Sequence, residues 1–145
     1  MTPAELSRAP CPVQSRPVKV LLVSPNPESR ELMGLAVAGI SRRLAVRLQF
    51  IEAANGEDGV KTAWRERPDV VVADEIASRA GAFALALELR GQMRPFEGVI
   101  VILLDRPQDA WLAEWSGADA WFVKPVDPFE LADRVVDLLR EKETA

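Results

Sequence analysis

The stretch PDVVVADE, residues 68–75, joins a short apolar run to two carboxylates, Asp74 and Glu75. The run consists of three valines and an alanine, and a Pro-Asp pair precedes it. This composition predicts a strand that is covered on both faces, as strands of parallel sheets are. Open α/β sheets bind ligands at the carboxyl ends of their strands. Asp74 therefore lies at the expected functional edge, where it either takes part in chemistry or only ends a strand.

Strand and helix patterns alternate five times along the chain. The predicted strands are residues 18–23, 46–50, 70–74, 99–104 and 120–123. The helical patterns that follow them open at Asn26, Asn55, Phe83, Pro107 and Asp127. Asn26 and Asp127 suit N-cap positions, and each is followed by a proline, which suits the first helical position. Alternation of this kind predicts an α/β domain with a parallel sheet and helices on both faces.

Apolar residues at helical spacing predict the buried helix faces. They are Leu32, Leu35, Ala36 and Ile40 in the first helix, and Leu131, Val135, Leu138 and Leu139 in the last. Trp111 and Trp115 share one helix face, and Trp121 follows in the next strand. We interpret these tryptophans as core residues. A partner surface is the alternative, because tryptophan is enriched among interface anchors.

Composition limits the classes of function. The net charge of −4 disfavours a broad basic surface, so no nucleic-acid partner is expected. Arg42, Arg43 and Arg47 are interpreted as a solvated helix end, with a phosphate-binding patch as the alternative. The chain has no histidine, which excludes Ser-His and Cys-His catalytic pairs and histidine metal sites. Cys11 stands alone and suits a reducing cytoplasm.

Two further expectations concern the ends of the chain and its location. Residues 1–17 are rich in proline and lack apolar periodicity, which predicts a flexible arm, with a partner-binding segment as the alternative. The ordered domain is expected to span residues 18–142, with no output domain. No apolar run is long enough to span a bilayer, so no membrane association is expected.

Several motifs together resemble the receiver domain of bacterial response regulators. They are Asn55-Gly56-Glu57, Pro68-Asp69, Asp74, Gly117-Ala118-Asp119, Lys124-Pro125 and Asp127-Pro128. The resemblance implies the flavodoxin-like (βα)5 fold with strand order 2-1-3-4-5. It also implies that Asp74 is the phosphoacceptor and that Lys124 contacts the phosphoryl oxygens. The peptide before Pro125 is typically cis in receivers, which X-Pro bonds readily allow.

The sequence departs from the receiver pattern at three places. Receivers use an acidic pair after the first strand to bind Mg²⁺, and here Ser24 and Pro25 stand at those positions. The hydroxyl residue that ends the fourth strand is replaced by Leu104, or by its neighbour if the alignment shifts by one position. The loop 75–81 lacks the usual proline. The aromatic switch position of the fifth strand is filled by Trp121.

These departures leave two interpretations of Asp74. It is either a relic carboxylate that forms an ion pair with Lys124, or a working phosphoacceptor with a weakened metal site. Asp105 is interpreted as a turn or helix-capping residue, with replacement of a lost carboxylate as the alternative. Glu75 is interpreted as a solvated loop residue rather than a metal ligand.

The expected function is therefore an atypical, stand-alone receiver, or pseudo-receiver, that is not an enzyme, holds no cofactor and acts through a signalling protein partner. The alternative is a single-domain response regulator that a histidine kinase phosphorylates on Asp74 with Mg²⁺. A homodimer through the fourth helix, fifth strand and fifth helix is a further alternative. A flavodoxin-like cofactor domain is disfavoured, because Pro25 and Pro27 remove backbone donors from the first β-α loop.

Overall fold

The apolar runs of the sequence form five parallel strands in one sheet, in the order β2-β1-β3-β4-β5. The computed structural model describes residues 16–75 and 81–144. The strands are β1 (Val18–Val23), β2 (Leu48–Ala53), β3 (Val70–Asp74), β4 (Val99–Leu104) and β5 (Ala120–Val123). The predicted α/β fold and its strand order are confirmed. The predictions for Cys11 and for most of the arm lie outside the described residues.

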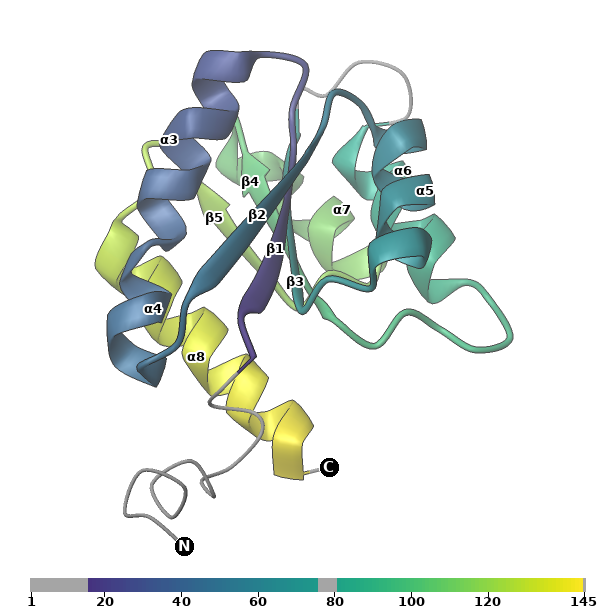
Figure 1. Cartoon of the computed structure of the whole chain (residues 1–145). Coiled ribbons are helices and arrows are strands. Elements are labelled where there is room, and N and C mark those ends of the chain that lie inside the picture. The colour runs from purple at the N-terminus through teal and green to yellow at the C-terminus, as the bar shows by residue number, and fades with distance from the viewer. Residues whose placement is uncertain (1–15, 76–80, 145) are drawn as a thin grey trace, which may run out of the picture.

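Helices cover both faces of the sheet, as Figure 1 shows. The helices are α3 (Pro27–Val37), α4 (Gly39–Leu44), α5 (Gly56–Glu66), α6 (Ala82–Arg90), α7 (Ala110–Trp115) and α8 (Pro128–Thr144), and a 3-10 turn, η1 (Pro107–Asp109), precedes α7. Helices α3, α4 and α8 lie on one face, and α5, α6 and α7 lie on the other. Successive strand residues point to opposite faces of the sheet. Val20 packs in the core on the side of α3, α4 and α8, and Leu21 packs in the core on the side of α5, α6 and α7.

Two helices begin directly after an asparagine that caps their first turn. The Asn26 side chain accepts a hydrogen bond from the Glu28 amide at 2.8 Å, and Asn55 accepts one from the Asp58 amide at 2.9 Å. Each bond satisfies an amide that has no partner within the helix. The helix after Asn26 therefore begins at the predicted residue.

The predicted buried stripe of the first helix is wrong in part. Leu32 and Leu35 are 66% and 67% exposed, whereas Met33 and Val37 are buried. The buried face passes through Gly34, which faces Leu22 of β1. The core-facing stripe is therefore rotated away from the two leucines.

The predicted start of the second strand is also wrong, because β2 begins at Leu48 rather than Val46. The chain continues from α3 into α4, which ends at Ala45 in the left-handed conformation, with φ of 53°. The Val46 amide then bonds back to the Ser41 carbonyl at 3.2 Å. Val46 thus belongs to the helix end and not to the sheet ladder.

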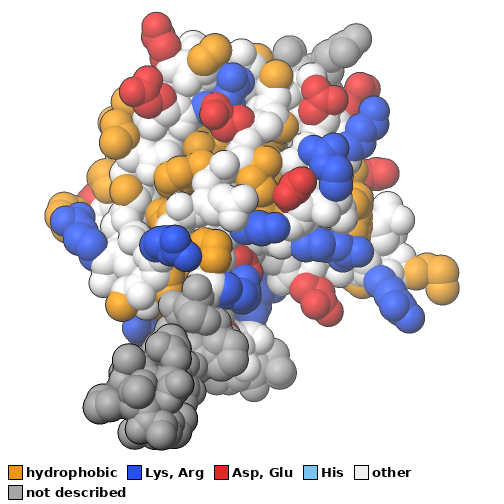
Figure 2. Space-filling view, in the orientation of Figure 1, with side chains coloured by type: hydrophobic (Ala, Val, Ile, Leu, Met, Phe, Trp, Pro, Cys, Tyr) orange, Lys and Arg blue, Asp and Glu red, His pale blue; other side chains and the backbone are white. Residues whose placement is uncertain are grey.

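At the amino edge of the sheet, basic side chains gather across the lower half of the face in Figure 2. Helix carboxyl ends meet at this edge, and cations there complement the negative ends of the helix dipoles. Arg42, Arg43 and Arg47 are exposed, and Arg43 pairs with Asp133, which agrees with the interpretation as a solvated helix end.

Arg90, at the end of α6, ties the amino end of β4 to the turn before β5. Its guanidinium donates to the carbonyls of Phe96, Gly98 and Gly117 and to the Asp119 carboxylate. Asp119 also accepts the Ile100 amide at 2.8 Å. The Gly117-Ala118-Asp119 motif is therefore structural, and it lies at the sheet edge opposite Asp74.

Candidate functional site

Asp74 ends β3 at the carboxyl edge of the sheet, where it is buried with 2% of its surface exposed. The Lys124 ammonium donates to Asp74 Oδ1 and also to Asp105 Oδ1, the second at 2.9 Å. Ser24 Oγ lies 3.4 Å from Asp74 Oδ2. The structure thus brings together Asp74, Lys124, Ser24 and Asp105 from the ends of four strands.

The strand ladder directs the Lys124 side chain toward Asp74. The Lys124 amide donates to the Leu104 carbonyl at 2.9 Å, which extends the pairing of β5 with β4 by one residue. The Lys124–Pro125 peptide is cis. Burial alone would lower the pKa of Lys124, but hydrogen bonds to Asp74 and Asp105 outweigh it and raise that pKa above its ordinary value. Lys124 is therefore a firmly charged partner of both carboxylates.

The loop after β1 presents a hydroxyl instead of carboxylates. Ser24 is fully buried and accepts the Asn26 amide at 3.3 Å, whereas Pro25 is exposed. The Arg30 guanidinium donates to the Ser24 carbonyl and pairs with Glu52 at 2.6 Å. The Arg30 guanidinium therefore lies beside the position where receivers carry their acidic pair.

This donor set does not fit Mg²⁺. The ion prefers carboxylate and water oxygens in an octahedral shell, and here the Asp74 carboxylate is already bonded to an ammonium group. Within residues 16–75 and 81–144, no three His, Cys, Asp or Glu side chains are grouped to hold a metal ion.

The end of β4 offers no hydroxyl. Leu103 and Leu104 are both buried, so the one-position ambiguity in the alignment does not alter this point. Leu104 packs in the core between the sheet and α5, α6 and α7, and the half-buried Trp121 packs against the same cluster. Neither leucine can donate a hydrogen bond from its side chain to a group on Asp74.

Glu75 is a site residue that the sequence interpretation missed. Glu75 Oε2 accepts the backbone amide of Asp105, and its carboxyl group is hydrogen-bonded to Asp109. Burial raises the pKa of Glu75, and the bond to Asp109 raises it further. The same bond, together with Arg106, lowers the pKa of Asp109. Glu75 is therefore a half-buried residue whose carboxyl group bonds the loop after β4, rather than a freely solvated loop residue.

Only the placement of Glu75 next to Asp74 hinted at this role in the sequence. Asp109 lies five residues beyond the end of β4, and no local pattern connects it with Glu75. Asp105 lies in the bend after β4, as expected, and its carboxylate also bonds to Lys124. The lost proline of the loop 75–81 falls within residues 76–80, outside the described part of the chain.

The prediction that Trp111 and Trp115 are core residues is wrong, because each is 64% exposed. Helix α7 spans only Ala110–Trp115, and it buries Ala113 on the side opposite the two tryptophans. A pair of large aromatic side chains one helical turn apart therefore faces outward.

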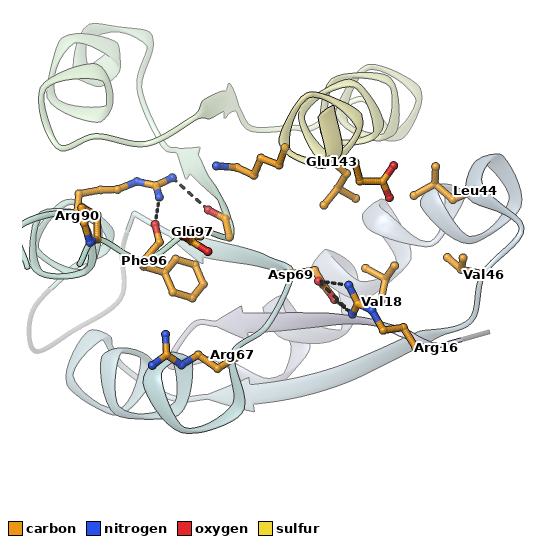
Figure 3. A pocket seen from close by; sticks show the side chains of 14 residues that line it. Arg16, Val18, Leu44, Val46, Arg67, Asp69, Arg90, Phe96, Glu97 and Glu143 are labelled. Carbon is orange, nitrogen blue, oxygen red and sulfur yellow. Dashed lines mark hydrogen bonds and ion pairs between the residues drawn. The ribbon is translucent and has the colours of Figure 1, made fainter. Parts of the chain in front are cut away.

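A cavity of about 1220 Å³ lies away from Asp74, at the amino edge of the sheet. Figure 3 shows Arg16 and Arg90 projecting at this cavity, with Arg16 bonded to Asp69 and Arg90 bonded to the Phe96 carbonyl. The Arg67 guanidinium lies over the Trp64 ring, 4.9 Å from its centroid. Because these cations are engaged with the protein itself, the cavity is a gap between element ends rather than a competing anion site.

The comparisons with known proteins agree with this geometry. No protein-family model matches the chain. An uncharacterized response regulatory protein of Mycobacterium tuberculosis is 31% identical over 129 residues, which cover 89% of this chain and 96% of that protein.

Solved receiver domains superpose on the structure. The BeF3-activated N-terminal receiver domain of RstA from Klebsiella pneumoniae has a TM-score of 0.67 and 27% identity, over 84% of this chain and 98% of that one. The receiver domain of a sensor histidine kinase from Pseudomonas aeruginosa, with a magnesium ion in its active-site cleft, has a TM-score of 0.71 and 19% identity, over 86% of this chain and 99% of that one. The chain therefore belongs to the receiver family of response regulators.

Proposed function

We propose that this protein is an atypical receiver that signals through protein-protein contact, with Mg²⁺-dependent phosphorylation of Asp74 impaired. One observation carries the proposal: the Asp74 carboxylate is bonded to Lys124, and Ser24 stands where a metal-binding carboxylate is expected. A receiver's role in two-component signalling does not depend on this proposal.

Phosphoryl transfer to a carboxylate brings negative charges together and needs a cation to neutralise them. In this site Lys124 is shared between Asp74 and Asp105, and Ser24 contributes no charge. The Arg30 guanidinium faces the Ser24 carbonyl and the Glu52 carboxylate rather than Asp74. A metal ion would therefore gain few ligands here, and the incoming phosphoryl group would meet an incompletely neutralised site.

The partner surface that we propose is the exposed face of α7, with Trp111 and Trp115 as anchors. Val123, at the end of the neighbouring β5, is also exposed. A signalling protein in the cytoplasm is the proposed occupant, and a second copy of the chain is the alternative. The absence of enzymatic turnover is part of the same proposal. None of the helices in the described segments is long and apolar enough to cross a membrane.

A phosphorylatable response regulator is the alternative, because Asp74 and Lys124 both occupy the positions that the chemistry requires. The two functions differ in one measurable property. The atypical receiver gains no phosphoryl group from a small donor, whereas the regulator gains one on Asp74 when Mg²⁺ is present.

The test is intact-mass spectrometry after incubation with acetyl phosphate and Mg²⁺. We compare the wild type, Asp74→Ala, and a double variant, Ser24→Asp with Pro25→Asp, that restores the acidic pair. We expect no added phosphoryl mass on the wild type or on Asp74→Ala, and a gain on the double variant. A Mg²⁺-dependent gain on the wild type that Asp74→Ala abolishes would establish the alternative.

A further inference from the structure

The loop between β4 and α7 is fastened to the end of β3 by side chains of the protein itself. The Glu75 amide donates to the Leu103 carbonyl at 2.9 Å, which continues the pairing of β3 with β4 beyond Asp74. From this position the Glu75 carboxyl group accepts the Asp105 amide, the first amide after β4. Glu75 therefore bonds the loop where it leaves the sheet.

The same carboxyl group reaches the loop a second time, just before α7. Glu75 is hydrogen-bonded to Asp109, which is buried and occupies the position before the first residue of the helix. The Asp109 side chain does not cap the helix, and it instead receives Glu75 on one side and Arg106 at 3.0 Å on the other. One side chain thus bonds both ends of a short loop, residues 105–109.

Lys124 adds a third contact to the loop, at Asp105 Oδ1. This ammonium group is also bonded to Asp74, so the loop, the phosphoacceptor position and the end of β5 are joined in one network. All of these contacts are made by groups of the protein itself. In receivers that carry a hydroxyl at the end of the fourth strand, that hydroxyl would bond the new phosphoryl group and draw the loop inward.

We propose that Glu75 is a permanent latch, which holds the 105–109 loop against the carboxyl edge of the sheet and so fixes the position of α7. Its carboxyl group serves the loop as a bound phosphoryl group would, by accepting the Asp105 amide and by bonding Asp109. The tryptophan-bearing face of α7 is then presented in one position whether or not Asp74 is modified. Glu75 is a positioning residue, since it acts on the partner surface only through the loop.

Amide hydrogen exchange of the full chain tests the latch, with neither Mg²⁺ nor a phosphate donor present. Glu75→Met keeps the length of the side chain but removes its acceptor and donor atoms, whereas Glu75→Gln keeps an acceptor for the Asp105 amide and a donor for Asp109. The matched control is Glu114→Gln, which removes an exposed carboxylate from α7 itself.

We expect amides of residues 105–115 to exchange about tenfold faster in Glu75→Met, and at the wild-type rate in Glu75→Gln and in the control. Peptides of β1 provide the internal reference for global stability. Unchanged exchange in Glu75→Met, or equal acceleration in Glu75→Met and Glu75→Gln, overturns the latch. Acceleration in β1 as large as that in residues 105–115 also overturns it, because the effect is then global.

The latch goes beyond the proposed function and is tested apart from it. A wild type that accepts a phosphoryl group contradicts the proposed function and leaves the exchange result standing. Failure of the exchange prediction leaves the phosphorylation result standing in the same way.

Discussion

Replacing Lys124 with methionine removes the ammonium group that Asp74 and Asp105 share while keeping an apolar stem of similar length. Asp74 is the more sensitive partner, because 3% of its side-chain surface is exposed against 36% for Asp105. Removing one member of a fully buried ion pair costs about 3–5 kcal/mol. Here 29% of the Lys124 side chain is exposed, so water reaches the vacated position. We therefore expect the free energy of unfolding to fall by about 2–3 kcal/mol.

The measurement is urea unfolding at pH 7, followed by circular dichroism. A loss of this size also lowers the melting temperature by about 5–10 °C for a chain of this length. The matched control is Lys61→Met on the exposed face of α5, which we expect to alter the free energy of unfolding by less than about 0.5 kcal/mol.

A double-mutant cycle separates the ion pair from lost packing. Asp74→Asn in the Lys124→Met background removes the buried charge that the first change leaves without its lysine. We expect the double variant to be more stable than the sum of the single changes by about 1–3 kcal/mol. The reasoning is refuted if Lys124→Met costs no more than Lys61→Met, or if the two changes are additive.

Three further predictions concern other parts of the molecule. Arg90→Met should lower the free energy of unfolding by about 3 kcal/mol in urea titrations, because it leaves three carbonyls and Asp119 without their donor, while exposed Arg94→Met should be neutral. Trp111→Ser with Trp115→Ser should cost less than about 1 kcal/mol, since both side chains are largely exposed, yet abolish partner capture in a binding assay. Folding raises the pKa of Lys124 above its ordinary value of 10.5. The stability that the Lys124 ammonium contributes is therefore complete below pH 10.5 and is lost as the pH rises through the raised pKa. Alkaline titration should therefore destabilise the wild type more than Lys124→Met.

The fold was predictable because its signals are local. Each strand is a short apolar run, and Asn26 marks a helix start through a hydrogen bond to an amide two residues away. The first helix shows the limit of this reasoning. Leu32 and Leu35 have the right spacing for a buried stripe, but the face that packs on the sheet carries Met33 and Val37 instead, and that choice depends on contacts with other elements.

The site was predictable only where the family pattern supplied positions. Asp74 and Lys124 are 50 residues apart in sequence and meet because both follow parallel strands. The bond between Glu75 and Asp109 has no such marker, since it depends on how the loop after β4 folds back. The tryptophans were misplaced for a related reason: α7 is too short to bury more than one side, and Ala113 takes that side.

At the carboxyl edge, cations of the protein itself already contact the carboxylates. A receiver that binds Mg²⁺ holds several carboxylates close together, and their mutual repulsion is relieved only when the ion enters. Here Lys124 bonds to both Asp74 and Asp105, Arg106 pairs with Asp109, and Glu75 is hydrogen-bonded to Asp109. A metal ion or phosphoryl group would have to displace these contacts. The loop that would respond to it is held by the same contacts, which is why we propose that a signal enters this protein by occupancy of its surface rather than by modification of Asp74.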